Sequence, residues 1–488
     1  MRLKVRKFQL KAGKPIAFVH QKDAEKLNIN VGERIEISYK DSMTIGIVDV
    51  VSGFIKSGEI ALSEQITNKL KLKSKYVNIG LGEYPKSTKF LKKKLNCIPY
   101  KKSEIKKIIN EIVKGSLTEA EVAYFISGIN YCGMNLEETK YLTEAIFESG
   151  KKIKWKQKNI ADKHSIGGVP GNRTTPIVVS ICSAVGIIMP KTSSRAITSA
   201  AGTADVIESI AKVNLSIDEL KSVVKKTGAC LAWGGSLGLA PADDKIIQTS
   251  KIIRIDPEPQ LLASILAKKL SVGSKFVLID IPHGSGAKVS LSKARSLKDK
   301  FIKIGKKLGL KIRVLLTDGS QPIGNGIGPI LEVRDILKVL RREDSPKDLE
   351  NKSLKLAGEL LEMVGKAKNG KGRKKALEIL NSGKAYKKFE EIIKAQSGSF
   401  KYLEFAKYKH EIKFKKSGKV KSINNKDINY LTRLTGCPLD KKAGIYLHKH
   451  KRDKIKKGET IITIYSESKH KLNQALNFYK IQKPIRLG

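Results

Sequence analysis

The chain has no apolar run long enough to cross a membrane, because polar or charged residues interrupt every hydrophobic stretch before about 18 residues. The residues after Met1 also lack the charged-then-apolar pattern and the cleavage site of a secretory leader. These absences argue against a spanning or secreted protein, and we expect a cytoplasmic protein without a membrane partner. A length of 488 residues with 40% hydrophobic content is ordinary for a globular chain of several domains.

Cysteine is scarce. The chain has 5 cysteines, an odd number, widely separated and without any pair spaced as CxxC: Cys97, Cys132, Cys182, Cys230 and Cys437. This distribution argues against a disulfide framework and against a zinc site. We therefore predict that the cysteines are small apolar side chains of the interior, and we expect no metal.

Acidic residues are half as frequent as basic ones, with 47 Asp and Glu against 95 Lys and Arg, and the formal net charge is +48. Such an excess suggests nucleic-acid binding through phosphate neutralisation. However, lysine is spread through every segment and greatly outnumbers arginine, the residue that bidentate phosphate recognition favours. We expect no dedicated nucleic-acid partner, although the basic clusters 366–375 and 448–457 keep an RNA-binding protein as the weakest alternative. The charge should draw anionic substrates.

The spacing of apolar residues predicts a multidomain protein of α/β and α+β class. Short alternating runs predict a small N-terminal β domain over residues 1–86, and helical spacing predicts a helical domain over 88–157, joined by about 240–272. From 160 to 400 strands and helices alternate, which indicates an α/β domain with a mostly parallel sheet. Residues 405–488 form a separate predicted α+β domain.

Helix starts and strands can be placed within these domains. Capping patterns occur at Ser116–Glu119, Asn135–Glu138 and Ser216–Glu219. Strands are predicted at 229–233, 276–281 and 311–316. Ligands of such sheets collect at the carboxyl ends of the strands, where the loops at Ser165, Ser193 and Gly284 are expected to lie.

The segment 163–176, KHSIGGVPGNRTTP, combines a cation, hydroxyls and glycines ahead of an apolar helix. Glycines let backbone N–H groups approach an anion, Thr174 or Thr175 can cap the helix, and Pro176 suits its first turn. A helix N-terminus favours negative charge. By itself this pattern is equally consistent with a simple turn, but segment 191–208 repeats it, and together they predict a phosphate site.

The motifs KHSxGG and SxRxxxxxxGTxDxxE resemble those of the thymidine and pyrimidine nucleoside phosphorylases, and the resemblance extends over nearly the whole chain. The variant SRAITS at 194–199 is most similar to the archaeal AMP phosphorylases within that family. The resemblance implies reversible phosphorolysis of AMP, and of CMP or UMP as further candidates, to free base and ribose 1,5-bisphosphate. It also implies AMP and orthophosphate as partners, no cofactor, and at least a homodimer.

The resemblance carries site residues onto this sequence. The orthophosphate ligands correspond to Lys163, Ser165, Ser193 and Thr203, whereas Thr174 replaces a serine. The nucleotide ligands correspond to Gly168, Ser194, Arg195, Ala196, Ile197, Thr198, Ser199, Thr203, Ser264 and Lys288. His164 and Lys268 are possible accessory residues. For Lys288 the alternative is a solvated lysine, which is common in so basic a chain. The family also closes its domains on the ligands, which implies hinges near 158 and 273.

Asp256 precedes an apolar helix, and its spacing alone favours an N-cap with Pro257 at the first helical position. The resemblance implies that Asp256 is the proton donor to the leaving base, a role that requires a carboxyl held protonated by burial or by anionic neighbours. Ser264 and Lys268 share one face of the following helix.

Two departures from the family concern substrate choice. Thymidine phosphorylases clamp the pyrimidine with an arginine seven residues before the position of Asp256, and this chain has Thr249 there. Thr198 and Ser199 add hydroxyl donors that suit a 5′-phosphate. A pyrimidine nucleoside phosphorylase therefore remains the alternative, without its expected clamp.

Overall fold

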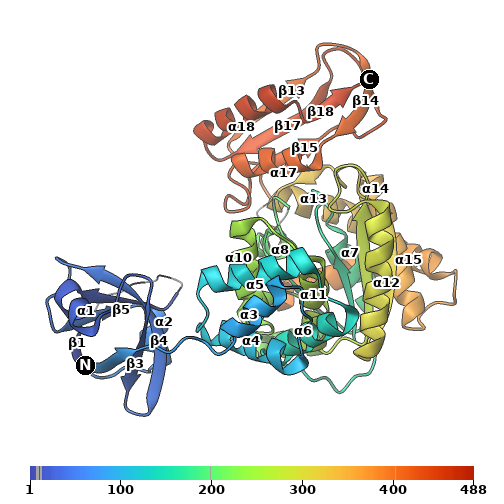
Figure 1. Ribbon diagram of the computed structural model, residues 1–488. Coiled ribbons are helices and arrows are strands. Elements are labelled where there is room, and N and C mark those ends of the chain that lie inside the picture. Colours follow the sequence, from blue (N-terminus) through green and yellow to red (C-terminus); the bar gives the residue numbers. More distant parts are fainter. Residues whose placement is uncertain (7–9, 11, 13, 198, 402) are drawn as a thin grey trace. The chain divides into compact units, whose positions relative to one another are not determined.

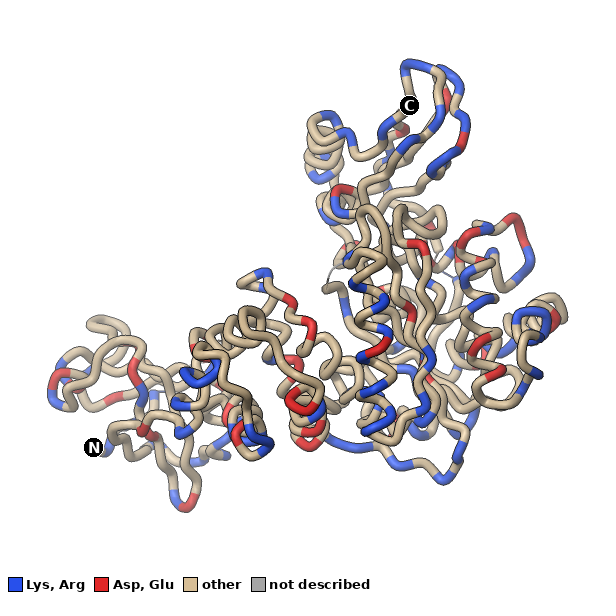
Figure 2. The backbone as a smooth tube through the Cα atoms, turned by 45° about the vertical axis from the view of Figure 1, so that its right-hand side comes forward, with Lys and Arg blue, Asp and Glu red and all other residues tan. Residues whose placement is uncertain are grey.

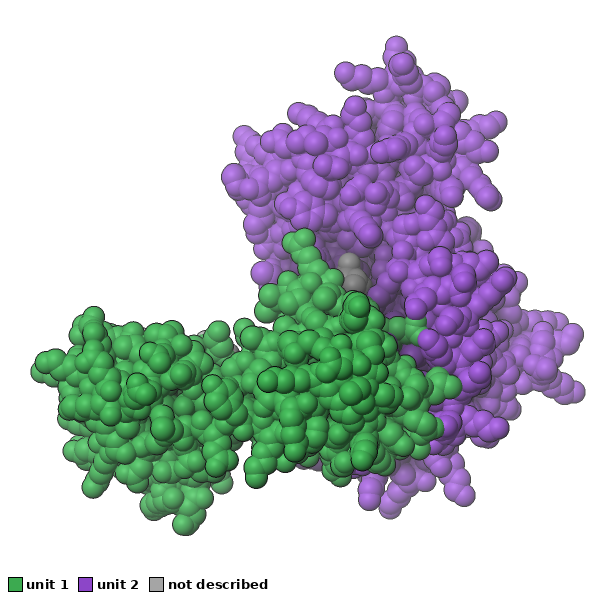
Figure 3. Space-filling view, in the orientation of Figure 1, with its two compact units in different colours: residues 1–145, 242–258 green, residues 146–241, 259–488 purple. Residues whose placement is uncertain are grey.

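The computed structural model describes residues 1–6, 10, 12, 14–197, 199–401 and 403–488. The chain divides into two compact units, shown in two colours in Figure 3: Met1–Ala145 with Ala242–Glu258, and Ile146–Pro241 with Pro259–Gly488. In the part of the chain just given, no helix combines the length and apolar character needed to cross a membrane.

The first unit begins with a closed β-barrel (Figure 1). Its strands follow the order β1-β5-β2-β4-β3-β6, and alternate residues such as Ile35 and Ile37 of β3 are fully buried, so one side of each strand forms the barrel core. The predicted small β domain is thus a barrel. The strands are β1 (Arg2–Arg6), β2 (Ile16–His20), β3 (Arg34–Tyr39), β4 (Ser42–Val51), β5 (Glu59–Leu62) and β6 (Tyr76–Leu81), with helices α1 (Gln21–Leu27) and α2 (Glu64–Lys69).

Helices make up the rest of the first unit, as the spacing predicts: α3 (Thr88–Leu95), α4 (Lys102–Lys114), α5 (Glu119–Cys132), α6 (Leu136–Glu148) and α10 (Pro241–Ile253). The predicted cap at Ser116 is wrong, because the N–H of Ser116 donates to Glu111 O and closes the end of α4. Thr118 caps α5 instead, in a reciprocal box with Glu121. The predicted cap at Asn135 is confirmed. The N–H of Glu138 donates to the Asn135 side chain, and the N–H of Asn135 donates to the Glu138 carboxylate.

A disulfide joins Cys97 to Cys132, whose Cα atoms lie 5.1 Å apart. Cys97 follows α3 and Cys132 ends α5, and these helices pack against each other. The prediction that every cysteine is an apolar filler is therefore wrong for this pair, because helix packing brings together residues that are 35 positions apart. The prediction is confirmed for three others, which are buried and unpaired: Cys182, Cys230 and Cys437.

A parallel sheet lies at the centre of the second unit, as predicted. Strands β7 (Ala161–Ser165), β10 (Phe276–His283) and β11 (Lys311–Asp318) pair in the order β11-β10-β7, and β8 (Met189–Ser193) pairs with β9 (Ala229–Trp233). A parallel bridge between Ile160 and Ile188 connects the two groups of strands. The carboxyl ends of these strands therefore share one edge.

Helices cover this sheet. The predicted cap of α9 is confirmed, because Ser216 and Glu219 form a reciprocal box and Gly228 ends the helix. Helix α11 begins at Glu258, one residue after the predicted start at Pro257. The helices of this region are α7 (Thr174–Ser183), α8 (Thr203–Glu208), α9 (Ile217–Thr227), α11 (Glu258–Val272), α12 (Leu291–Lys307), α13 (Pro329–Arg341), α14 (Lys347–Met363), α15 (Gly372–Asn381) and α16 (Lys384–Ala395), with a 3-10 turn at Gly234–Leu237.

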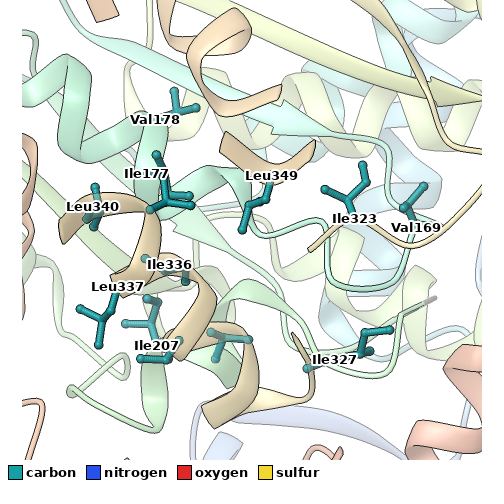
Figure 4. Packing of buried hydrophobic residues seen from close by; sticks show 14 of the residues in the cluster. Val169, Ile177, Val178, Ile207, Ile323, Ile327, Ile336, Leu337, Leu340 and Leu349 are labelled. Atoms are coloured by element: carbon teal, nitrogen blue, oxygen red, sulfur yellow. The ribbon is translucent and has the colours of Figure 1, made fainter. Parts of the chain in front are cut away.

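The loop that follows β7 packs against the hydrophobic core of the second unit. In Figure 4, Ile336 of α13 lies near Ile177 of α7 and Ile207 of α8, and Val169 lies beside Ile323. The N–H of Ile323 also donates to Pro170 O at 3.1 Å. Apolar burial of this kind contributes about 25 cal/mol per Å², so the segment after β7 is held by the main core.

The last part of the second unit is α+β, as predicted. One of its sheets has the order β12-β15-β17-β13 and another the order β16-β14-β18. The first sheet includes β12 (Gly326–Ile327) from the α/β region. This strand is too short to leave a periodic signal in the sequence. The remaining elements are β13 (Tyr408–Lys413), β14 (Gly418–Ile423), α17 (Asn425–Leu434), β15 (Gly444–Leu447), β16 (Lys454–Ile455), β17 (Thr460–Ser466), α18 (Lys469–Gln482) and β18 (Ile485–Leu487).

Candidate active site

Loops 166–173, 194–202 and 284–288 follow β7, β8 and β10 at the carboxyl edge of the sheet, as predicted. Gly168 lies against Lys288: a Cβ on Gly168 would be 3.0 Å from Lys288 Cβ, and its φ is +91°. Only glycine accommodates both the positive φ and this approach without strain. The structure thus brings together two predicted nucleotide ligands from distant parts of the chain.

Lys163 is fully buried, and its Nζ donates to Thr174 Oγ1 at 2.8 Å and to Thr175 Oγ1 at 3.4 Å. Neither threonine caps α7, because the helix already begins at Thr174 and Arg173 is the N-cap residue. The predicted capping role is therefore wrong, and the hydroxyls orient the lysine instead. Pro176 lies in the first helical turn, as predicted.

Asp280, Lys163, Lys352 and Thr317 form what we call the Asp280 cluster. Lys352 Nζ lies 3.1 Å from the Asp280 carboxylate, and Thr317 Oγ1 donates to it at 2.6 Å. Burial lowers the pKa of Lys163 to about 7, although Asp280 opposes the shift. Burial by itself would raise the pKa of Asp280, but Lys352 and Lys163 hold it below its ordinary value.

The neighbouring residues of β7 point to the opposite side of the sheet and form the Asp162 cluster. Asp162 lies 3.1 Å from Lys191 Nζ and accepts a bond from Lys269 Nζ at 2.7 Å. Burial lowers the pKa of Lys269 to about 7. Burial and the adjacent lysines also lower the pKa of His164 well below 6.5, so its imidazole is neutral near pH 7.

Each of these clusters sets two lysines against one carboxylate, and in each cluster burial lowers the pKa of one lysine to about 7. A buried charge is stable only when it is paired, so an anion close to either cluster would favour the protonated form of its second lysine. Lys163 and Ser165 alternate with Asp162 and His164 along β7, and Ser165 ends the strand. The base of the phosphate loop is thus electropositive.

Arg173 connects the loop after β7 to the loop after β8. Its guanidinium pairs with Glu332 and donates to Thr203 Oγ1 at 2.8 Å and to Ala201 O at 2.9 Å. Burial raises the pKa of Glu332 even though Arg173 opposes this. Sequence reasoning missed Arg173 as a site residue, and its only signal was a lone arginine inside the first hydroxyl-rich loop.

The loop after β8 is fastened to the helix that follows it. Asp205 Oδ2 accepts from the N–H of Ala196 at 2.7 Å and from the N–H of Gly202 at 2.8 Å. Arg195 donates to Glu208 at 2.7 and 2.6 Å and lies over the Trp233 ring at 4.7 Å. These hydrogen bonds to Glu208 raise the pKa of Arg195. The backbone of the predicted nucleotide loop is therefore held at Ala196 and at Gly202.

The other predicted ligands have the following contacts. Ser165 Oγ accepts from Asn172 at 3.5 Å, Ser193 Oγ donates to Ala232 O at 3.3 Å, and Ser199 Oγ donates to Ala201 O at 2.7 Å. Two other predicted ligands in this loop are Ser194 and Ile197. The Ser194 carbonyl accepts from the N–H of Ala204 at 3.3 Å. Thr198, also a predicted ligand, lies outside the described residues.

Asp256 belongs to the first unit, where it is exposed in the loop between α10 and α11. Thr249 is buried in α10, and its hydroxyl donates to Lys245 O at 3.4 Å. In the second unit, Lys268 donates to Ser264 at 3.5 Å on one face of α11, as their spacing predicts. The proton-donor role of Asp256 stays a prediction.

Three family descriptions match the chain. Residues 88–150 match the helical bundle domain of a glycosyl transferase family, 157–386 match its a/b domain, and 419–486 match the pyrimidine nucleoside phosphorylase C-terminal domain. The fold resembles that of anthranilate phosphoribosyltransferase from Thermus thermophilus, with a TM-score of 0.53 and 15% identity over 63% of this chain and 99% of that one. The class is therefore a glycosyl transferase with helical and α/β domains.

Relatives that match over nearly their whole length narrow this class to one family. An AMP phosphorylase of Methanococcus aeolicus is 43% identical over 93% of this chain and 91% of its own length. Those of Thermococcus sibiricus and Pyrococcus furiosus are each 41% identical over 100% of this chain and 98% of their own lengths. The chain belongs to the AMP phosphorylase family, which confirms the resemblance that its two loop motifs carry.

Proposed function

We propose that this protein catalyses the reversible phosphorolysis of AMP to adenine and ribose 1,5-bisphosphate. The proposal is supported by relatives named AMP phosphorylase that match it over nearly their whole length. The observation that carries it is the Asp280 cluster, in which Lys163 and Lys352 face one carboxylate and Lys163 also contacts the first residue of α7, directly after the phosphate loop. Such a site stabilises a multiply charged anion.

In the proposed mechanism, orthophosphate is held by Lys163, Ser165, Ser193 and Thr203. Its oxygen attacks C1′ while the bond between C1′ and N9 breaks, and the positive charge that develops on the ribose is stabilised by the phosphate itself. Asp256 gives a proton to N7, so adenine leaves as a neutral base. The phosphorylated ribose keeps its 5′-phosphate and gains a phosphate at C1′.

The nucleotide is held by the loop 194–199 together with Gly168, Ser264 and Lys288. Two features support a nucleotide over a pyrimidine nucleoside: the hydroxyls of Ser199 and its neighbours in the loop, and Thr249 in place of the expected arginine. The pyrimidine nucleoside phosphorylase alternative is not favoured by the relatives. CMP and UMP remain candidate substrates.

The reaction as written balances without a metal or an organic cofactor, because phosphate is the nucleophile and a carboxyl supplies the proton. We further propose a cytoplasmic homodimer or larger homo-oligomer that acts without a nucleic-acid partner. Figure 2 is consistent with the last point, since Lys and Arg occur along the backbone of both units.

The test is incubation of the purified protein with orthophosphate and AMP, CMP, UMP, adenosine, thymidine or uridine in parallel, with free base measured by chromatography. Release of adenine from AMP and not from adenosine is expected. Base release from thymidine or uridine only would establish the pyrimidine alternative. No release from any substrate, combined with RNA retention that collapses as salt rises, would favour the RNA-binding alternative.

A further inference from the structure

Helix α17 carries a row of polar side chains on one face. Asn425, Asn429 and Arg433 are spaced at i, i+4 and i+8, so they lie one above another along the helix. Asn425 and Asn429 are buried, with 0% and 7% of their surface exposed. Buried amides are stable only when they are hydrogen-bonded, so their partners indicate what this face does.

The first residue of the row contacts the strand ends of the parallel sheet. Asn425 Nδ2 donates to Gly319 O at 2.8 Å and to Gly286 O at 3.2 Å. Gly319 directly follows β11, and Gly286 lies in the loop that leads to Lys288. One side chain of α17 thus joins two loops at the carboxyl edge.

The other two residues contact the predicted nucleotide loop. Asn429 Oδ1 accepts from the N–H of Ala200 at 2.9 Å. Arg433 Nη2 donates to Ile197 O at 3.1 Å and to Ser199 O at 2.9 Å. These bonds join residues that are 229 to 236 positions apart in the chain.

The ends and the middle of the nucleotide loop therefore have different supports. Asp205, from the helix that follows the loop, holds the backbone of Ala196 and Gly202. Helix α17 holds the backbone at Ile197, Ser199 and Ala200. Because backbone groups and short hydroxyls of this loop are the predicted donors to the 5′-phosphate, their positions depend on α17.

We propose that Asn429 and Arg433 are positioning residues for the nucleotide, and that α17 makes the C-terminal region part of the substrate site. This inference rests on the proposed function. The residues act through the loop backbone and do not touch the reacting atoms. Their loss should weaken AMP binding more than orthophosphate binding, because the bonds that orient Lys163 come from α7 and not from α17.

The variants are Asn429→Ala, which removes the acceptor for Ala200, and Arg433→Met, which removes both donors to the loop. Asn429→Asp is the rescue variant, because it keeps an acceptor oxygen and lies one helical turn from Arg433. Arg486→Met on the exposed side of β18 is the matched control. Initial rates of adenine release are measured with AMP and orthophosphate varied in turn, and amide hydrogen exchange is followed in peptides that cover 194–202.

Asn429→Ala and Arg433→Met are expected to raise the KM for AMP about tenfold, with the KM for phosphate within about twofold of the parent, because a small displacement of positioning groups weakens binding strongly. Exchange at Ala200 should accelerate at least about tenfold in Asn429→Ala. Asn429→Asp and Arg486→Met should stay close to the parent in both readouts.

An unchanged KM for AMP in both variants overturns the positioning role, even if hydrogen exchange accelerates. Equal rises in both KM values, together with a lower melting temperature, also overturn it, since they indicate a general structural effect. If the parent protein releases no adenine from AMP, the proposed function itself fails. The parent assay therefore separates the two failures.

Discussion

The Lys163 ammonium donates to the Thr174 hydroxyl at 2.8 Å, and this bond joins the middle of β7 to the first turn of α7. It places a buried cation beside a helix N-terminus, where backbone N–H groups have no partner inside the helix. Both features favour an anion at the same point. The relationship makes Lys163 the central charge of the proposed phosphate site.

Lys163→Met should remove most of the phosphate affinity of this site. Loss of a buried cation that stabilises phosphate is expected to lower kcat/KM for orthophosphate by about 10²–10³. Sulfate should no longer raise the melting temperature. Lys306→Met, at an exposed position of α12, serves as the control and should behave as the parent. Parent-like kinetics in Lys163→Met would remove Lys163 from the mechanism.

Sulfate affinity should depend on pH through Lys163. Burial lowers the pKa of this lysine to about 7, so it is protonated below that pH and loses its proton above it. Sulfate keeps both charges over this range and binds the protonated form better. Its dissociation constant, measured by calorimetry, should therefore stay flat below pH 7 and rise above it by up to about tenfold per pH unit for one linked proton.

Lys163→Arg provides the control for that pH dependence, because a guanidinium remains protonated throughout this range. Its sulfate affinity should vary much less above about pH 7. The same steep rise in the arginine variant would assign the titration to another group, with Lys269 as the next candidate, since burial lowers its pKa to about 7 as well.

Asp256→Asn should reduce turnover. General-acid catalysis typically contributes about 10²–10⁴-fold, so kcat for AMP is expected to fall by about that factor while the KM for phosphate changes little. Asp299→Asn on the exposed side of α12 is the isosteric control. Turnover of Asp256→Asn near that of the parent would show that the leaving adenine obtains its proton elsewhere.

Cys97→Ser should destabilise the first unit under oxidising conditions. The disulfide closes a segment with a sequence separation of 35, for which a loss of about 4 kcal/mol in unfolding free energy is expected. Denaturant melts of the parent and the variant, with and without reductant, measure the difference. Reductant should lower the stability of the parent and leave the variant unchanged, and no reductant effect on the parent would contradict the bond.

Several parts of the fold could be predicted because their signals are local. The cap at Ser216 and the strand at 229–233 depend on residues within a few positions of one another. The same kind of signal wrongly predicted a cap at Ser116 and missed the true cap of α5 at Thr118, because Ser116 closes α4 before α5 begins. Neighbouring helix ends compete for the same short polar residues, and packing decides between them.

The candidate site also has parts that the sequence predicts and parts that it does not. The hydroxyl and glycine loops around Ser165 and Ser193 are visible in the sequence, since an anion site needs backbone N–H groups and cations close together along the chain. The role of Arg173 as a connection between those loops is not visible, because its partner Glu332 is 159 positions away.

By itself, the sequence determined the loop motifs, the order of the β, helical, α/β and α+β regions, and the family to which the chain belongs, because each depends on residues near one another or on a motif at fixed spacing. Only the tertiary structure decided that Cys97 meets Cys132, that β12 joins the C-terminal sheet, and that α17 holds the loop at Ala200. These contacts join distant segments whose meeting depends on how whole elements bury their apolar faces. No local pattern along the chain records such a meeting.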